Sequence, residues 1–265
     1  MNHATQNNYE ELARLSKRGF LGQIIPEHRA LLSSSLSRQK WSEILIIPLA
    51  FNFLILKCAN LLGQYWQAIF DFWFQRLNIP GQITLQSLEF FGIQAELPRF
   101  DIPSSPPDAT IWWLLAAVTA LFFGATRILP KRFMPLFYML YFLGLFITVS
   151  LIYFAVAPAR FPYTVSGYLD NLLTTAIWLL VVMPWAHALI YYIFDFSLFK
   201  KIGLTLLTTA FIVAALPFQI LSQIVVLANL SIIVLPLLYV FFGIFVLILC
   251  SLSLYGWAMS WERSK

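Results

Sequence analysis

The fold is decided by residues Ile202 to Trp261, which read IGLTLLTTAFIVAALPFQILSQIVVLANLSIIVLPLLYVFFGIFVLILCSLSLYGWAMSW. These 60 residues include no Asp, Glu, Lys, Arg or His. A single helix of this length would measure about 90 Å, roughly three times the hydrocarbon thickness of a bilayer. Because a soluble fold of this size needs no such stretch, the sequence predicts an all-α polytopic membrane protein.

Basic residues flank this stretch on both sides, namely Lys200, Lys201, Arg263 and Lys265. Lys and Arg in short flanks favour the cytoplasmic side of a membrane, so we expect both ends there and an even number of crossings. Two helices fit the length, one near 203–221 and one near 233–258. We expect the short, mostly apolar segment between them, 221–230, to lie in or dip into the outer interface.

The composition supports the membrane class and argues against nucleic-acid binding. Hydrophobic residues make up 60% of the chain and charged residues 11%, with a mean hydropathy of +0.78. The net charge is +5, and 13 of the 17 Lys and Arg fall on the predicted cytoplasmic side. This positive-inside asymmetry accounts for the basic balance, so we expect lipid rather than nucleic acid as its partner.

The pattern predicts six transmembrane helices in a cell inner (plasma) membrane, with both termini cytoplasmic. The expected regions are a basic amphipathic N-terminal segment (1–40), a first transmembrane helix (41–62), an extracytoplasmic loop (63–108), a five-helix membrane bundle (109–261) and a cytoplasmic tail (262–265).

The extracytoplasmic loop is expected to begin with an interfacial helix at 64–77. At helical spacing Trp66, Phe70 and Trp73 share one face, opposite a polar face, which favours a helix on the outer leaflet or a docking surface for a partner. A continuation of the first helix into a cap is the alternative. Residues 83–92 fit either a short helix or a strand, and periodicity does not decide between them.

A histidine in the fourth predicted span is the first candidate for chemistry. His187, Tyr191 and Asp195 share a helical face, an arrangement that would suit a proton relay or a head-group site. The alternative is a structural histidine that hydrogen-bonds near the helix end. Lys57, inside the first span, lies close enough to its outer end for the ammonium to reach the head groups.

Three amide side chains are the second candidate. Gln219, Gln223 and Asn229 would line a polar cavity, or they would join helices by hydrogen bonds. The two cysteines, Cys58 and Cys250, are predicted at opposite depths, so we expect no disulfide. We find no metal-ligand spacing or catalytic motif, and we expect no cofactor, no metal and no assigned catalytic residue.

These patterns favour a non-enzymatic subunit or anchor of a larger envelope complex, for secretion, conjugation or polymer export. Its partners would be the lipid bilayer and other membrane or envelope proteins. The first alternative is a permease for lipids or small solutes that uses the amide cluster. The second is an intramembrane enzyme that uses His187.

Overall fold

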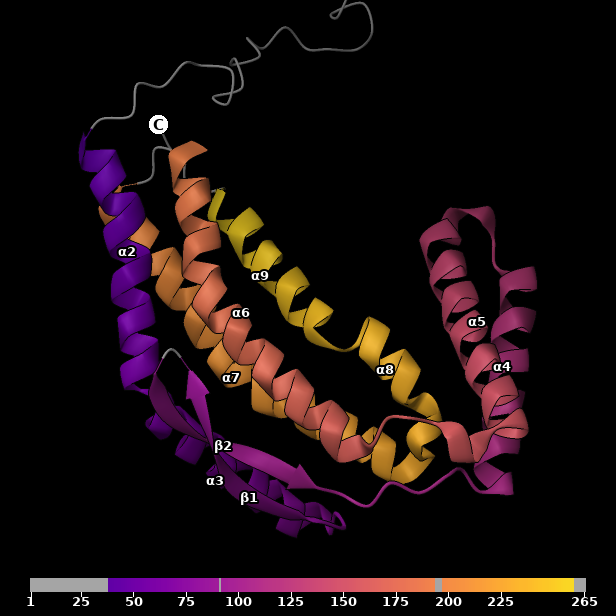
Figure 1. Ribbon diagram of the computed structural model, residues 1–265. Coiled ribbons are helices and arrows are strands. Elements are labelled where there is room, and N and C mark those ends of the chain that lie inside the picture. Colours follow the sequence, from indigo (N-terminus) through magenta and orange to yellow (C-terminus); the bar gives the residue numbers. More distant parts are fainter. Residues whose placement is uncertain (1–37, 91, 194–196, 260–265) are drawn as a thin grey trace, which may run out of the picture.

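The computed structural model describes residues 38–90, 92–193 and 197–259 (Figure 1). Residues 1–37 of the predicted N-terminal segment, Asp195 and the basic residues after position 259 lie outside the described residues. We call the end of the molecule where α3 and the two strands lie the hairpin end, and the other the opposite end.

The described chain is mostly helical. Its α-helices are α2 (Arg38–Lys57), α3 (Ala59–Leu77), α4 (Ala109–Ile128), α5 (Met134–Val156), α6 (Val165–Ile193), α7 (Leu198–Leu230), α8 (Leu235–Phe241) and α9 (Ile244–Met259). The remaining elements are β1 (Gln82–Phe90), β2 (Ile93–Asp101) and the 3₁₀ turns η2 (Lys131–Phe133), η3 (Pro158–Arg160) and η4 (Ile232–Val234).

Five segments are long and apolar enough to cross a membrane: α4, α5, α6, α7 and the broken run from η4 to α9. Helices α2 and α3 are long and apolar enough for a membrane span only when taken together. The chain bends by 57° at the junction between them. The structure therefore has five to six candidate spans and confirms the predicted polytopic helical class. The count of six and the orientation stay predictions.

The helix predicted at 41–62 is interrupted at Cys58. Helix α2 ends at Lys57, and α3 begins a new direction after Cys58, whose φ of −90° and ψ of 3° depart from helical values. The change of direction lets α3 lay its aromatic face against β2 and α7. We attribute the bend to the burial of that face. The local sequence shows the apolar face but not the residues that cover it.

Segment 221–230 is a continuation of the helix, because α7 runs without interruption to Leu230, and the predicted helix end near 221 is too early. Thirteen residues without glycine or proline follow Pro217, and the amides of Gln219 and Gln223 find acceptors inside the bundle. The chain turns at Ser231, where φ is 63°. The next span is then broken between α8 and α9.

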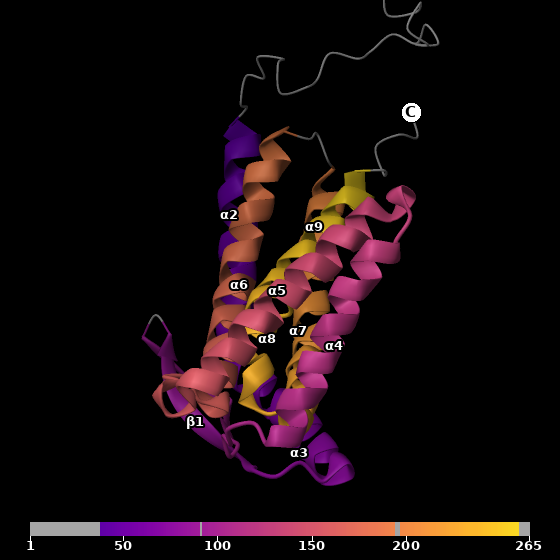
Figure 2. The same ribbon diagram turned by 90° about the vertical axis from the view of Figure 1, so that its right-hand side faces the viewer.

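The helices form two groups that meet at the hairpin end (Figure 1). Helices α6 and α7 run side by side, with α2 packed on α6 and α9 on α7. Helices α4 and α5 form a hairpin whose contacts with the rest of the chain are made through η4 and α8 (Figures 1 and 2). Toward the opposite end the two groups diverge.

Residues 82–101 form an antiparallel β-hairpin, which settles the open choice at 83–92 in favour of a strand and departs from the all-α expectation. The pairing runs one-to-one from Gln82 opposite Asp101 to Phe90 opposite Ile93. Glycines with positive φ stand at the entry, Gly81 with 138°, and at the tip, Gly92 with 78°. A strand is stable only when it pairs with another strand. The partner at 93–101 is recognised only in the folded chain, so local periodicity could not identify it.

Candidate functional site

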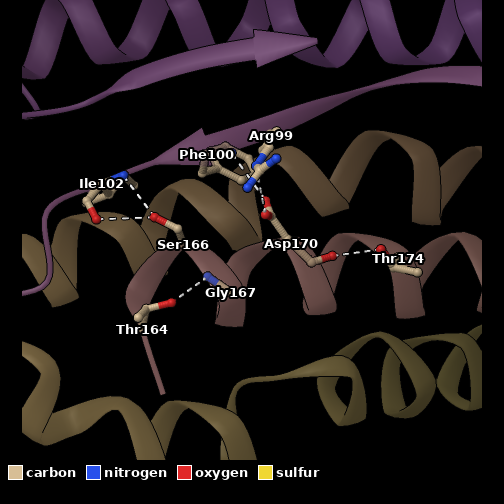
Figure 3. A network of polar contacts seen from close by, with 8 residues as sticks. All are labelled: Arg99, Phe100, Ile102, Thr164, Ser166, Gly167, Asp170 and Thr174. Atoms are coloured by element: carbon tan, nitrogen blue, oxygen red, sulfur yellow. Dashed lines mark hydrogen bonds and ion pairs between the residues drawn. The ribbon is translucent and has the colours of Figure 1, made fainter. Parts of the chain in front are cut away.

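The first turns of α6 hold strand β2 by its backbone (Figure 3). The Phe100 N–H donates to Asp170 Oδ1 over 3.2 Å, and the Ile102 N–H donates to Ser166 Oγ over 3.0 Å. Ser166 Oγ donates in turn to the Ile102 carbonyl over 3.2 Å. Asp170 also lies 3.7 Å from Arg99 Nε, so one carboxylate receives both a backbone amide and a guanidinium.

Helix α3 completes this attachment. Asn60 Oδ1 accepts the Glu96 N–H over 3.0 Å. Pro98, two residues farther along β2, has no N–H to satisfy. From Glu96 to Ile102, every amide on the edge of β2 that faces away from β1 is therefore bonded to a helix side chain or absent, and that edge is closed.

Helix α3 comes unusually close to β2 at Gly63. A Cβ placed on Gly63 would lie 1.8 Å from the carbonyl oxygen of Glu96 and 3.0 Å from its carbonyl carbon. Because the obstruction is backbone rather than a flexible side chain, only glycine fits this position without a shift of the strand.

The predicted aromatic docking face is turned inward. Trp66 and Phe70 are buried, Trp66 Nε1 donates to the Val213 carbonyl of α7 over 3.0 Å, and the Phe70 ring meets the Phe100 ring edge-on at 5.0 Å. Trp73 is partly buried beside them. The chain's own strand and helix cover this face, so it does not present the expected docking surface.

The carboxylate of Asp170 gives a test of the attachment. We expect Asp170→Ala to destabilise the protein by about 1–3 kcal/mol, because the buried Phe100 N–H loses its acceptor. Asp170→Asn should retain most of the stability, since an amide oxygen still accepts that bond. Thermal unfolding in one detergent measures both variants, and equal losses would contradict this role of the acceptor.

Two of the three predicted amide side chains, those of Gln219 and Gln223, lie together. Both hydrogen-bond to backbone carbonyls at the break in the last span. Gln219 Nε2 donates to the carbonyls of Phe242 and Gly243, each over 2.7 Å, and Gln223 Nε2 also donates to Phe242. Gln223 Oε1 accepts from the Tyr168 hydroxyl over 2.6 Å. These side chains replace helical bonds where α8 stops, as buried backbone requires in a bilayer.

The other predicted site residues do not join this cluster. Asn229 is exposed and donates to Val225 of its own helix over 2.7 Å. The Lys57 ammonium lies 5.6 Å from the ring centre of Phe53, one turn earlier. His187 is buried in α6. The structure does not describe the side chain of Tyr191 or any part of Asp195, so the proton relay stays a prediction.

Sequence reasoning missed an ion pair between the first and the long helix. Lys201 Nζ, at the start of α7, lies 2.5 Å from Glu43 Oε2, at the start of α2, and both side chains are largely buried. A carboxylate before the first apolar run and a lysine before the longest one were the available signals. Their 158-residue separation hid the pairing.

Within the described ranges, no group of three or more His, Cys, Asp or Glu is placed to hold a metal ion. A hollow of about 490 Å³ lies at the hairpin end between α6 and α8, with Tyr168 and Tyr239 on its wall. These features define a helical, membrane-type bundle with an attached β-hairpin. No family model, curated protein or solved structure matches the chain.

Proposed function

We propose that this protein is a multi-pass inner-membrane protein that serves as a non-enzymatic subunit or anchor of a larger envelope complex. The distribution of Lys and Arg supports an orientation with the hairpin end extracytoplasmic and the opposite end cytoplasmic. We propose secretion, conjugation or polymer export as the kind of assembly that it serves.

The observation that carries this proposal is the α4–α5 hairpin. Of the most apolar window of α4, 11% is buried inside the protein, against 44% in α6 and in α7. The main contacts of the α4–α5 hairpin with the rest of the chain are made through η4 and α8, toward the hairpin end. Away from that end the hairpin stands apart from the other helices, which leaves it open to another membrane helix (Figure 1). Such a hairpin suits a subunit whose packing is completed by a partner.

One face of α4 supports close helix association. Ala117, Ala120 and Gly124 are exposed, and Ala120 and Gly124 have the spacing of small residues at which membrane helices approach each other. A Cβ on Gly124 would meet nothing within 4 Å, so this position is free of contacts inside the chain.

The test is purification from native membranes in a mild detergent, with mass spectrometry of the co-purifying proteins. We expect stoichiometric partners, and we expect Gly124→Leu to lose at least one of them because the added side chain blocks helix approach. Gly256→Leu is the matched control, since Gly256 is an exposed helical glycine with the same free surroundings. A wild-type protein that purifies alone would contradict the proposal.

The broken last span favours a second candidate, a permease for lipids or small solutes. Helices interrupted within the bilayer often line transport sites. Tyr168 lies on the wall of the hollow and hydrogen-bonds to Gln223, which in turn donates to Phe242 at the break. Purified protein in liposomes should then move a substrate unaided, and Gln223→Leu should reduce that movement. Absence of transport by the protein alone would exclude this candidate.

A further inference from the structure

The two edges of the β-hairpin differ, and the difference points to a binding site. We propose that the outer edge of β1 accepts an extended, basic segment of an extracytoplasmic partner as a third strand. This inference rests on the proposed function and deepens it, because it assigns the surface at which one partner is held. We call this edge the β1 edge.

The hydrogen bonds of β2 establish which β1 groups face outward. The N–H groups of Glu96 and Phe100 point to helix side chains, away from β1. Amide directions alternate along a strand, so the odd-numbered residues of β2 bond to β1. Their partners in the pairing are the even-numbered residues of β1. The outward backbone groups of the β1 edge are therefore those of the odd-numbered residues, Ile83, Leu85, Ser87 and Glu89.

These outward groups have no hydrogen-bond partner among the described residues. The β1 edge also lacks the features by which proteins protect free edges. Strand β1 contains no lysine or proline, its pairing with β2 has no bulge, and it is nine residues long, whereas an average strand has about five to six. Free edges of this kind are the templates for strand addition.

The attachment of β2 holds this edge in place before any partner arrives. Asn60, Ser166 and Asp170 hold β2 from the side opposite the β1 edge. Binding to a segment already held in its bound conformation costs less conformational entropy than binding to a mobile one. The closed edge and the free edge thus have complementary roles: one fixes the hairpin, and the other is available.

Charge identifies the partner segment as basic. In the pairing, Ser87 stands opposite Glu96 and Glu89 opposite Gln94, so the two carboxylates lie on one face of the hairpin. Both are exposed, and neither makes an ion pair within the described residues. Arg99 occupies the other face and is engaged by Asp170. A second copy of the chain would add further carboxylates, whereas Lys or Arg in the added strand would neutralise them.

The test uses two nine-residue peptides and the full chain in nanodiscs of zwitterionic phosphatidylcholine, which does not attract basic peptides. One peptide alternates Lys with Val, and the other alternates Glu with Val. We expect the Lys peptide to bind about tenfold or more tightly than the Glu peptide, with weaker binding at high salt. Hydrogen exchange should slow at the amides of Ile83, Leu85, Ser87 and Glu89, and not at Thr84, Gln86 or Leu88.

Proline substitutions test the edge directly. Leu85→Pro/Ser87→Pro removes two outward donors and leaves the bonds to β2, so it should abolish binding of the Lys peptide. Leu85→Ala/Ser87→Ala keeps both donors and should keep binding. Slow exchange at Gln86 confirms that the hairpin remains paired in each variant. Equal binding by the proline and alanine variants, or no slowing at the outward amides, would overturn the proposal.

Two further results separate this proposal from the proposed function. If the proline variant co-purifies with every native partner, the β1 edge is not the docking site, while the subunit function stands. If the wild-type protein purifies alone and yet binds the Lys peptide as described, the subunit function falls and the edge site stands. Slowed exchange at the outward amides without peptide, together with a dimeric mass, would assign the edge to a second copy and overturn the basic partner.

Discussion

Gly63→Ala is expected to separate the β-hairpin from α3 and to destabilise the protein by about 1–3 kcal/mol or more, the range found for added methyl groups in packed interiors. The new Cβ would lie 1.8 Å from the Glu96 carbonyl oxygen. Strand and helix must move apart to admit it, which strains the bond between Asn60 and Glu96 and uncovers buried Trp66 and Phe70.

The measurement for Gly63→Ala is hydrogen exchange at the amides of Glu96 and Phe100, together with thermal unfolding in detergent. Both amides should exchange faster, and the transition should move to lower temperature. Gly203→Ala is the matched control, because a Cβ there meets nothing within 4 Å and alanine favours a helix by about 0.5–1 kcal/mol. A Gly63 variant as stable as this control would show that the close approach is unimportant.

Lys201→Met is expected to cost about 3–5 kcal/mol, because it leaves the Glu43 carboxylate buried without the ammonium that faces it. Lys201 Nζ lies 2.5 Å from Glu43 Oε2, and the two side chains are 7% and 17% exposed. This pair joins the beginning of α2 to the beginning of α7, so its loss should loosen α2 at the opposite end of the molecule.

The double variant Glu43→Leu/Lys201→Met distinguishes a broken pair from a general packing defect. Replacing both charges with apolar groups removes the burial penalty together with the attraction, so most of the lost stability should return. Unfolding by sodium dodecyl sulfate in mixed micelles, followed by tryptophan fluorescence, measures the three proteins. A double variant as unstable as Lys201→Met would contradict the ion-pair explanation.

Periodicity identified the apolar face of the segment at 64–77 but not what covers it. A helix with Trp66, Phe70 and Trp73 on one side satisfies the same pattern whether lipid, a partner or its own chain lies against that side. In the structure Phe100 and Val213, distant in sequence, meet this face. The spacing therefore predicted the helix correctly and left its role undetermined.

Polar side chains in the apolar stretch misled the prediction of its turn. Gln219 and Gln223 suggested an exposed segment, because polar groups in a bilayer need partners that local sequence does not show. Their partners are carbonyls of Phe242 and Gly243, about 20 residues away along the chain. The same contacts allow the last span, which the sequence predicts as one helix near 233–258, to break at Phe242 and Gly243.

By itself, the sequence determined the class of protein: long charge-free stretches cannot remain in water, so their length and hydropathy define a polytopic helical chain. Only the tertiary structure decided the closed edge of β2, the exact place for Gly63, the pairing of Glu43 with Lys201 and the free β1 edge. Each depends on backbone or side-chain groups that lie far apart in sequence and meet through folding. Hydropathy shows which residues avoid water. It does not show which of them contact one another in the folded chain.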